Sequence, residues 1–599
     1  MKSRIRQTRV CSHYGQWEFA RQIKFFLRLG SASFRRGIQV LTYLSLPTGR
    51  FATQTVQRID QEKWPMKRLV LSLFSLFALA LACAQPPAVV TLTPTAPSPD
   101  STVPSGGEYP PFTIALEYAI PGLASAYAPS GVTYAKPQPI FGMWGIIEPQ
   151  PGKYNWGPLD NLVIEYQTAG FTGIQLLITA ESPWASVNPP SLLNLGDTFP
   201  RDEYLDEYAD FVGHFVERYD GDGTDDAPGL LNPIHHYGIE REFTGFWPGS
   251  AEDYVRLLRT AYPVIHTADP QAEVLIVAIL IVDVFDGDPD AAELQRRLIT
   301  PQTGIRKSVS EIQTILAACD AYDIIDFHSL GDYTEIPPTA AWLRDQMETN
   351  GCGEKPLWIG DAFSMSMLVG YNARPVWPAT LETRNHVIDS LKLVADPSST
   401  GHTQAKAWLY AQMARGLVKK IVVSAGEGLY GINIGNLEDW KTGLPAVDAL
   451  GAPLVGASMF MGMMDSKVTG QQVGDGLPGY RAPGQLRPAF FAVKLVNEKI
   501  NGFTSVDKLD LGAGIWAYRF TMPSGPLWVL WYDDGKLYFP GEMPPTATIE
   551  LAINAANILI THTPTEVGKS EPEKEVLESS SGILPLLLKS TPIFVQIAP

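Results

Sequence analysis

The stretch Ile234-His-His-Tyr-Gly-Ile-Glu-Arg-Glu242 is a short β-rich run that ends in charged residues. A stretch with helical spacing follows at residues 251–268, and it is opened by Ser250 with Asp253 three positions later, which resembles a capping box. The order of strand, loop and helix is typical of parallel sheets with crossover helices. This stretch therefore predicts an α/β fold.

The same unit recurs along the middle of the chain. Eight β-rich runs are expected at residues 113–118, 140–144, 173–179, 234–242, 272–282, 323–328, 356–361 and 420–425. Helices are expected at residues 203–219, 251–268 and 489–500. Eight runs fit a closed (β/α)8 TIM barrel over residues 113–502, and because about 250 residues are typical of that fold, some loops must carry insertions. The longest is expected at residues 444–487, which are rich in Gly, Met and Pro.

After residue 502 the pattern becomes the alternation typical of strands. Trp516, Tyr518 and Phe520 occupy every second position, and the turn signal Asp533-Asp-Gly535 follows the next run. We therefore predict a small antiparallel β-sandwich over residues 503–599.

The amino-terminal part differs in composition from the rest. Residues 1–65 are rich in Lys and Arg, although the whole chain has a formal net charge of −17. At Met66 a short basic start precedes an apolar run and the small-residue site Ala80-Leu-Ala-Cys83, which together have the three parts of a secretory signal peptide. We interpret residues 66–83 as that signal and residues 1–65 as a doubtful upstream extension. The alternative is a basic arm that binds nucleic acid or anionic lipid.

Cys83 completes a site that resembles a bacterial lipobox, in which the Cys is lipidated and becomes the first residue. Ala80-Leu-Ala would also serve ordinary signal peptidase, so free secretion stays open. The apolar run is too short to span a bilayer, and residues 84–112, rich in Pro, Thr and Ser, read as a linker. We therefore expect the protein to be exported, either as a lipoprotein on the outer face of the cell membrane or in the periplasm, or as a secreted protein.

The composition also limits partners and cofactors. An acidic exported body argues against nucleic acid, because a phosphate backbone requires a basic face. The sequence has no zinc-ligand spacing, phosphate-binding Gly loop or Gly-x-Ser-x-Gly motif, so neither a metal nor a cofactor is expected. Residues 220–226 have the acidic spacing of a calcium loop without its bidentate Glu, which favours a plain acidic turn.

Two carboxylates follow predicted strands where barrel enzymes place their catalytic residues, at the carboxyl ends. They are Glu242, after the fourth run, and Asp361, after the seventh. Cleavage of a glycosidic bond needs two carboxyl groups, one protonated to assist the leaving oxygen and one ionised to attack the anomeric carbon or activate water. The two residues are candidates for such a site, but their spacing alone does not establish it, because a strand-end carboxylate more often caps a helix.

Longer segments surround these carboxylates: Trp144-Gly-Ile-Ile-Glu-Pro-Gln-Pro-Gly-Lys-Tyr-Asn-Trp156, Tyr237-Gly-Ile-Glu-Arg-Glu-Phe-Thr-Gly-Phe-Trp247 and Lys355-Pro-Leu-Trp-Ile-Gly-Asp361. Together they resemble clan A glycoside hydrolases, among them the β-galactosidase and β-xylosidase types. The resemblance implies a carbohydrate substrate, with Glu242 as the acid/base and Asp361 in the place of the nucleophilic Glu. Asp326-Phe-His328 is similar to the segment whose His lines the sugar pocket.

Three positions depart from that pattern. Arg241 stands where the clan has an Asn that holds the sugar; a guanidinium only donates hydrogen bonds and would favour the charged form of Glu242. Asp361 is one methylene shorter than Glu, which predicts a wider gap between the carboxyl groups. The run expected as strand eight lacks the Trp that lies under the sugar. Three residues are candidates for that surface: Trp184, Trp247 and Trp440.

Three more residues are candidates for sugar contacts: Glu181, Glu240 and His328. Glu181 follows the third run, and Glu240 lies on the same strand face as Glu242. Each also has a structural alternative. Glu181 could anchor its loop, Glu240 could pair with Arg241, and His328 could form hydrogen bonds that only support the fold.

Two functions stay open from the sequence. The first is a glycoside hydrolase that cleaves oligo- or polysaccharides at the cell surface by a two-carboxylate mechanism. The alternative is a catalytically inactive barrel that binds carbohydrate, because one fold hosts many functions. A solute-binding lipoprotein would fit the anchor but not the eight-run pattern.

Cys319 and Cys352 are expected to pair. Cys319 lies nine residues before His328 and Cys352 nine before Asp361, so both should lie at the amino-terminal face of adjacent strands. Neighbouring strands are about 4.8 Å apart, within reach of a disulfide, and an exported location supplies the oxidising compartment. The alternative is two separate buried thiols.

Overall fold

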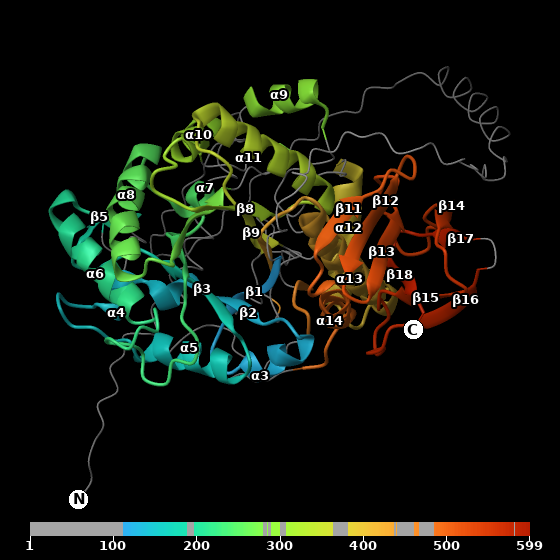
Figure 1. Ribbon diagram of the computed structural model, residues 1–599, viewed down its shortest axis with the longest axis horizontal. Coiled ribbons are helices and arrows are strands. Elements are labelled where there is room, and N and C mark those ends of the chain that lie inside the picture. The colour runs from blue at the N-terminus through green and yellow to red at the C-terminus, as the bar shows by residue number, and fades with distance from the viewer. Residues whose placement is uncertain are drawn as a thin grey trace, which may run out of the picture. The chain divides into compact units, whose positions relative to one another are not determined.

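In the computed structural model, eight parallel strands close into a barrel ringed by helices (Figure 1). The strands are β1 (Thr113–Ala119), β2 (Tyr134–Pro137), β3 (Gly173–Ile178), β6 (His236–Ile239), β7 (Glu273–Ile279), β8 (Ile324–Ser329), β9 (Leu357–Ala362) and β10 (Gly431–Ile434). β1 pairs with both β2 and β10, which closes the ring. The structure describes residues 112–188, 197–279, 284–285, 289–299, 307–362, 381–435, 439, 460–465, 484–579 and 582–598. The predicted TIM barrel is confirmed.

The larger helices of the barrel are α5 (Gly157–Thr168), α6 (Leu205–Glu217), α8 (Ala251–Ala268), α9 (Ala291–Ile299), α10 (Val309–Leu316), α11 (Ile336–Asn350), α12 (Leu381–Ala395), α13 (His402–Gly426) and α14 (Pro488–Ile500). The predicted capping box at the start of α8 is present, because the Ser250 side chain accepts the Asp253 N–H while the Asp253 carboxylate accepts the Ser250 N–H. α6 lies beside α8 (Figure 1) and buries its apolar side. The three helices predicted from spacing are therefore found.

The second strand lies elsewhere than predicted. Residues 139–147 form the 3-10 helix η3 (Pro139–Gly142) and the short helix α4 (Trp144–Ile147), whereas the strand is Tyr134–Pro137. Pro139 at the first position of η3 favours a helical turn there. The real strand was not recognised because its central residue is Lys136, a charged side chain that the barrel buries completely.

The eighth strand was also misplaced. Residues 420–425 are the last turns of α13, and every residue from Leu417 to Ala425 is buried. A helix that is buried on all sides loses its polar face, so a short β-branched run there cannot be distinguished from a strand by periodicity. The true strand is β10, which begins after Gly428 in the left-handed conformation (φ +67°).

The carboxyl-terminal part forms antiparallel sheets. Six strands pair in one sheet, in the order β11 (Ser505–Lys508), β12 (Ile515–Met522), β13 (Gly525–Tyr532), β18 (Ile593–Ile597), β15 (Asn557–His562) and β16 (Lys574–Glu578), and β14 (Ala547–Ala552) pairs with β17 (Ile583–Leu588). Tyr518 and Phe520 join the barrel core, whereas Ala517 packs in a separate core that includes β14 and β17 residues. The predicted alternation and β-sandwich are thus confirmed.

The segments predicted as extension, signal peptide, lipidation site and linker lie outside the described residues, apart from Phe112. Most of the long loop predicted at residues 444–487 also lies outside them. Among the residues that the structure describes, no helix is both long and apolar enough to cross a membrane.

Candidate active site

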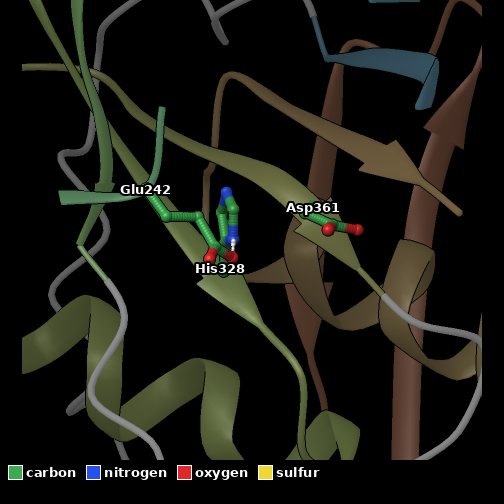
Figure 2. A group of neighbouring side chains, drawn as sticks. All are labelled: Glu242, His328 and Asp361. Carbon is green, nitrogen blue, oxygen red and sulfur yellow. Dashed lines mark hydrogen bonds and ion pairs between the residues drawn. The ribbon is translucent and has the colours of Figure 1, made fainter. Parts of the chain in front are cut away.

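Glu242 and His328 meet at the carboxyl end of the barrel. Glu242 follows β6 and is the N-cap residue of the short helix α7 (Phe243–Phe246), so the turn into α7 sets the direction of its side chain. His328 lies on β8, and its Nδ1 is 2.8 Å from Glu242 Oε1 (Figure 2). Sequence reasoning placed these residues in one site, and the structure brings them into direct contact.

Asp361 joins them from the neighbouring strand. It pairs in register with His328, and one donor atom from each of Glu242, His328 and Asp361 lies within 4.8 Å of the others (Figure 2). Retaining glycosidases hold their carboxyl groups about 5 to 5.5 Å apart, and inverting enzymes about 6.5 to 9.5 Å. The two carboxylates thus belong to one site, as predicted, with one oxygen of each within 4.8 Å of the other.

The expected widening of the gap by the shorter Asp361 side chain is not observed, and an irregularity in β9 explains why. The register with β8 shifts between Phe327 and His328, which leaves Gly360 as the extra residue before Asp361. Such bulges bend the strand and redirect the next side chain. A Cβ on Gly360 would lie 2.0 Å from Asp326 Oδ2, so only glycine fits.

Asp361 is almost completely buried, at 1% exposure. Burial raises its pKa, and the negative charge of Glu242 adds to this, whereas the positive charges of His328 and Lys136 oppose it. Tyr118, at the end of β1 with a left-handed backbone (φ +57°), donates to Asp361 Oδ2 at 3.3 Å. These partners favour the ionised carboxylate that burial disfavours.

A buried network that the sequence reasoning missed lies beside Asp361. Lys136 is 3.0 Å from Glu117 and donates to the carbonyl of Gly360 at 2.6 Å, and Asn433 donates to Glu117 and to the same carbonyl. Burial raises the pKa of Glu117 to about 8, against the effect of Lys136. The network holds the bulge that positions Asp361. In the sequence, Glu117 and Lys136 are two single charged residues far apart, and nothing local indicates that they pair.

His328 carries a positive charge at neutral pH. Burial lowers its pKa, but the hydrogen bond to Glu242 and the negative charges of Glu242, Asp326 and Asp361 outweigh burial and raise it to about 8. With both ring nitrogens protonated it acts as a donor, and a protonated imidazole is not a metal ligand. The three donor atoms are also close enough to one another to be considered as metal ligands if His328 is neutral.

This charge makes stability depend on pH. Because the folded pKa of about 8 exceeds the ordinary value of 6.5, the stabilisation is complete below pH 6.5 and is lost as the pH rises through 8. Relative to the His328→Gln variant, the wild type should therefore lose about 2 kcal/mol of unfolding free energy between pH 6 and pH 9. Urea unfolding of both proteins at the two pH values measures this difference. An unchanged difference would contradict the charged state of His328.

Arg241 forms an ion pair with Glu181, with Nη2 2.6 Å from Oε1 and both side chains largely buried. Glu181 thus anchors the loop after β3, which was its structural alternative. Glu240, in the left-handed conformation (φ +67°), accepts the N–H of Ala180 at 2.6 Å. Burial raises its pKa to about 7, whereas that hydrogen bond and the charge of Arg241 lower it. All three residues link the loops after β3 and β6.

The Trp residues proposed as sugar platforms differ in their surroundings. Trp247 is only 4% exposed, packs against Phe199 and Tyr254, and donates to the carbonyl of Ser250. It belongs to the core, because the loop turns back into α8 there, and its assignment as a sugar contact is corrected.

Trp184 is half-buried, packs edge-on against Trp144 and donates to the carbonyl of Glu148. The Glu148 carboxylate accepts from the Trp144 indole and the Gly152 N–H, so this motif is closed by its own hydrogen bonds. Trp440 lies outside the described residues.

The acidic loop at residues 220–226 uses its carboxylates internally. Asp226 accepts the N–H groups of Gly221 and Gly223, and Asp222 accepts that of Thr224. Burial raises the pKa of Asp220 to about 6. These contacts agree with a plain acidic turn.

Cys319 and Cys352 form a disulfide with Cα atoms 5.6 Å apart, the pairing expected from their matching register. Cys319 follows α10 and Cys352 follows α11, so the bond joins the ends of two neighbouring helices.

Opening this bond should destabilise the fold by about 3.5 kcal/mol, the chain-entropy value for a loop of this length with a sequence separation of 33 residues. The Cys319→Ala/Cys352→Ala double variant should therefore melt at a lower temperature than the oxidised wild type. Adding reductant should lower the midpoint of the wild type alone. If the wild type also fails to respond, the bond does not contribute to stability.

No family model and no curated protein matches the sequence. Solved structures do match. A family 39 glycoside hydrolase from the gut symbiont Bacteroides cellulosilyticus WH2 matches with a TM-score of 0.50 and 12% identity over 82% of both chains. A monomeric β-xylosidase from Caulobacter crescentus CB15 has a TM-score of 0.46 and 14% identity over 82% of this chain and 97% of that one. A glucosidase from Croceicoccus marinus has a TM-score of 0.45 and 11% identity over 82% and 96%. The first of these similarities shows that this chain shares a barrel fold with that hydrolase.

Proposed function

We propose that this protein is a retaining glycoside hydrolase in which Glu242 is the acid/base and Asp361 the nucleophile. The observation that carries the proposal is the approach of the two carboxylates to within 4.8 Å at the carboxyl end of the barrel. This approach supports the closer spacing of retaining enzymes over the wider gap in which an inverting enzyme places its water. The substrate class is oligo- or polysaccharide with O-glycosidic linkages.

In the first step Asp361 attacks the anomeric carbon while Glu242 donates a proton to the leaving oxygen, so a covalent glycosyl–Asp361 ester forms as the glycosidic bond breaks. The His328–Glu242 hydrogen bond is the source of that proton. Transfer along this 2.8 Å contact converts imidazolium and carboxylate into neutral imidazole and carboxylic acid. In the second step Glu242 takes a proton from a water molecule whose oxygen attacks the anomeric carbon, so the bond from the sugar to Asp361 breaks and the sugar leaves with a new hydroxyl group. The proton then returns from Glu242 to His328.

The outcome of hydrolysis tests the proposal directly. The purified protein should hydrolyse members of a panel of aryl glycosides and oligosaccharides. Proton NMR recorded during the first minutes should show a first-formed sugar with the anomeric configuration of the substrate. Initial formation of the opposite anomer would refute the assignment of Asp361 as nucleophile.

A catalytically inactive carbohydrate-binding barrel is the second candidate. The burial of Asp361 and the rise in its pKa favour it, because a protonated carboxyl cannot attack. Binding of oligosaccharides without turnover across the panel, measured by calorimetry and by activity assays between pH 5 and pH 7, where His328 keeps its charge, would favour this candidate over the enzyme.

We also propose that the chain is exported and held at the outer face of the membrane, or in the periplasm, by a lipid on Cys83. The signal-like segment at residues 66–83 and the linker-like composition of residues 84–112 support this. In a bacterial host, mass spectrometry of the mature amino terminus should find a diacylglyceryl group on Cys83. Release of the Cys83→Ala protein into the soluble fraction is expected, and an unmodified Cys83 in the wild type would indicate free secretion.

A further inference from the structure

A second cavity lies between helix α13 and the loop that follows β13. It has a volume of about 280 Å³ and is lined by none of the three residues of the candidate active site. One wall consists of Trp408, Gln412, Arg415 and Lys419, whose spacing places them on one face of α13. The other wall is formed mainly by residues 532–545. A cavity below the usual 300 to 1,000 Å³ of drug-sized ligand pockets suits one small ring.

Arg415 is a partly buried cation in this wall, and in the described chain no carboxylate pairs with it. Its one described hydrogen bond runs from Nε to Thr591 Oγ1 at 2.8 Å. A guanidinium has five donors in a planar fork, so four are left for a ligand. Burial lowers the pKa of Arg415, because a partly buried guanidinium is less well solvated by water. Lys419 differs, because its Nζ lies 2.7 Å from Asp533.

The charges of the other wall limit what Arg415 can bind. Four carboxylates also line the cavity: Asp332, Asp533, Asp534 and Glu542. They would repel a phosphate or sulfate group with more than one negative charge. One carboxylate on the ligand matches one guanidinium and can accept two parallel hydrogen bonds from it.

The remaining lining fits a sugar ring. Trp408 and Phe539 stack with ring centroids 5.3 Å apart, and both line the cavity, so they offer apolar surface for the C–H face of a ring. Asp332 Oδ1 is buried and has no hydrogen-bond partner in the described chain. Burial and the charge of Asp533 raise the pKa of Asp332 to about 6. At neutral pH the atom is therefore an acceptor for a hydroxyl group.

We propose that this cavity is a non-catalytic binding site for a uronic acid residue. Arg415 binds the sugar carboxylate through its terminal amino groups, Trp408 and Phe539 contact the ring, and Asp332 accepts a hydroxyl. The site thus holds one residue of an acidic polysaccharide on the protein. It does not depend on the assignment of Glu242 and Asp361.

Calorimetric titration of the purified full chain with D-glucuronate, D-galacturonate, D-glucose and acetate tests this. At least one uronate should bind, and neither glucose nor acetate should bind within tenfold of it. The Arg415→Gln variant should bind the uronate with an affinity lower by about tenfold or more, as expected for the loss of one charged hydrogen bond. Arg519→Gln, which removes an exposed Arg paired with Asp507, should bind as the wild type does.

A second variant guards against a folding defect in Arg415→Gln. Gln412→Phe fills the cavity from the same helix face and removes no described hydrogen bond, so it should also abolish uronate binding while its melting temperature stays close to that of the wild type. Asp361→Asn should leave uronate binding unchanged. Equal binding of acetate and uronate, full binding by Gln412→Phe, or loss of binding in Asp361→Asn would each overturn the proposal.

Discussion

Replacing Glu242 by Gln should lower kcat/KM on unactivated oligosaccharides by about 10²- to 10⁴-fold, the usual contribution of a general acid. The amide keeps the shape of the side chain but has no proton to give to the leaving oxygen. On nitrophenyl glycosides the rate of the first step should fall much less, because a good leaving group needs little acid assistance. Steady-state rates on both substrate classes measure the contrast.

The control for this comparison is Glu293→Gln, since Glu293 is a helix carboxylate on α9 that pairs with Arg296 and Arg297 and is not part of the candidate active site. It should retain wild-type rates on both substrate classes. Equal losses on both classes in Glu242→Gln would contradict the acid role and would point to a defect in binding.

Replacing Asp361 by Asn should cost more, roughly 10⁴-fold or beyond on every substrate, as expected for loss of a nucleophile. Leaving-group quality should not rescue this variant, because no ester can form. After incubation of the wild-type protein with a 2-fluoro glycoside, which traps the covalent intermediate, mass spectrometry should find the sugar on the peptide that contains Asp361. The same peptide of Asp361→Asn should carry no sugar.

Asp361→Glu is the matched variant that keeps the charge. Since the bulge at Gly360 already brings Asp361 close to Glu242, the longer side chain should crowd the site and lower activity. If Asp361→Glu were faster than the wild type, the shorter carboxylate would be what limits the enzyme, and our interpretation of the bulge would be wrong.

The sequence predicted six of the eight barrel strands, and both failures have physical causes. The strand β2 was not predicted because it contains Lys136, and one charged residue in a short run gives no sign that it is buried in an ion pair. The apolar end of α13 was mistaken for a strand because it has no polar face. In both places the secondary structure is set by burial in the folded protein and not by the local sequence preference.

The candidate catalytic residues were predicted from the sequence, but the residues that hold them in place were not. Glu242 and Asp361 were predicted from their positions at strand ends together with the resemblance of the segments around them, and His328 from that resemblance. Tyr118 and Lys136, which hold Asp361 and its strand, come from β1 and β2, and contacts between elements so far apart in sequence leave no local pattern. Trp247 was misassigned because an aromatic residue near a strand end packs into the core as readily as it lines a pocket.

The closure of the barrel has a consequence for how the chain folds. Tyr118 and Asp361 are separated by 243 residues, and β10, the last strand, pairs with β1, the first. Until residue 434 has been synthesised, the outer edges of β1 and β9 have no neighbour, and open strand edges of a partly folded chain favour association with other chains. Chains truncated before β10 should therefore aggregate instead of forming smaller barrels, and a chaperone that delays folding until the whole barrel is available would raise the yield.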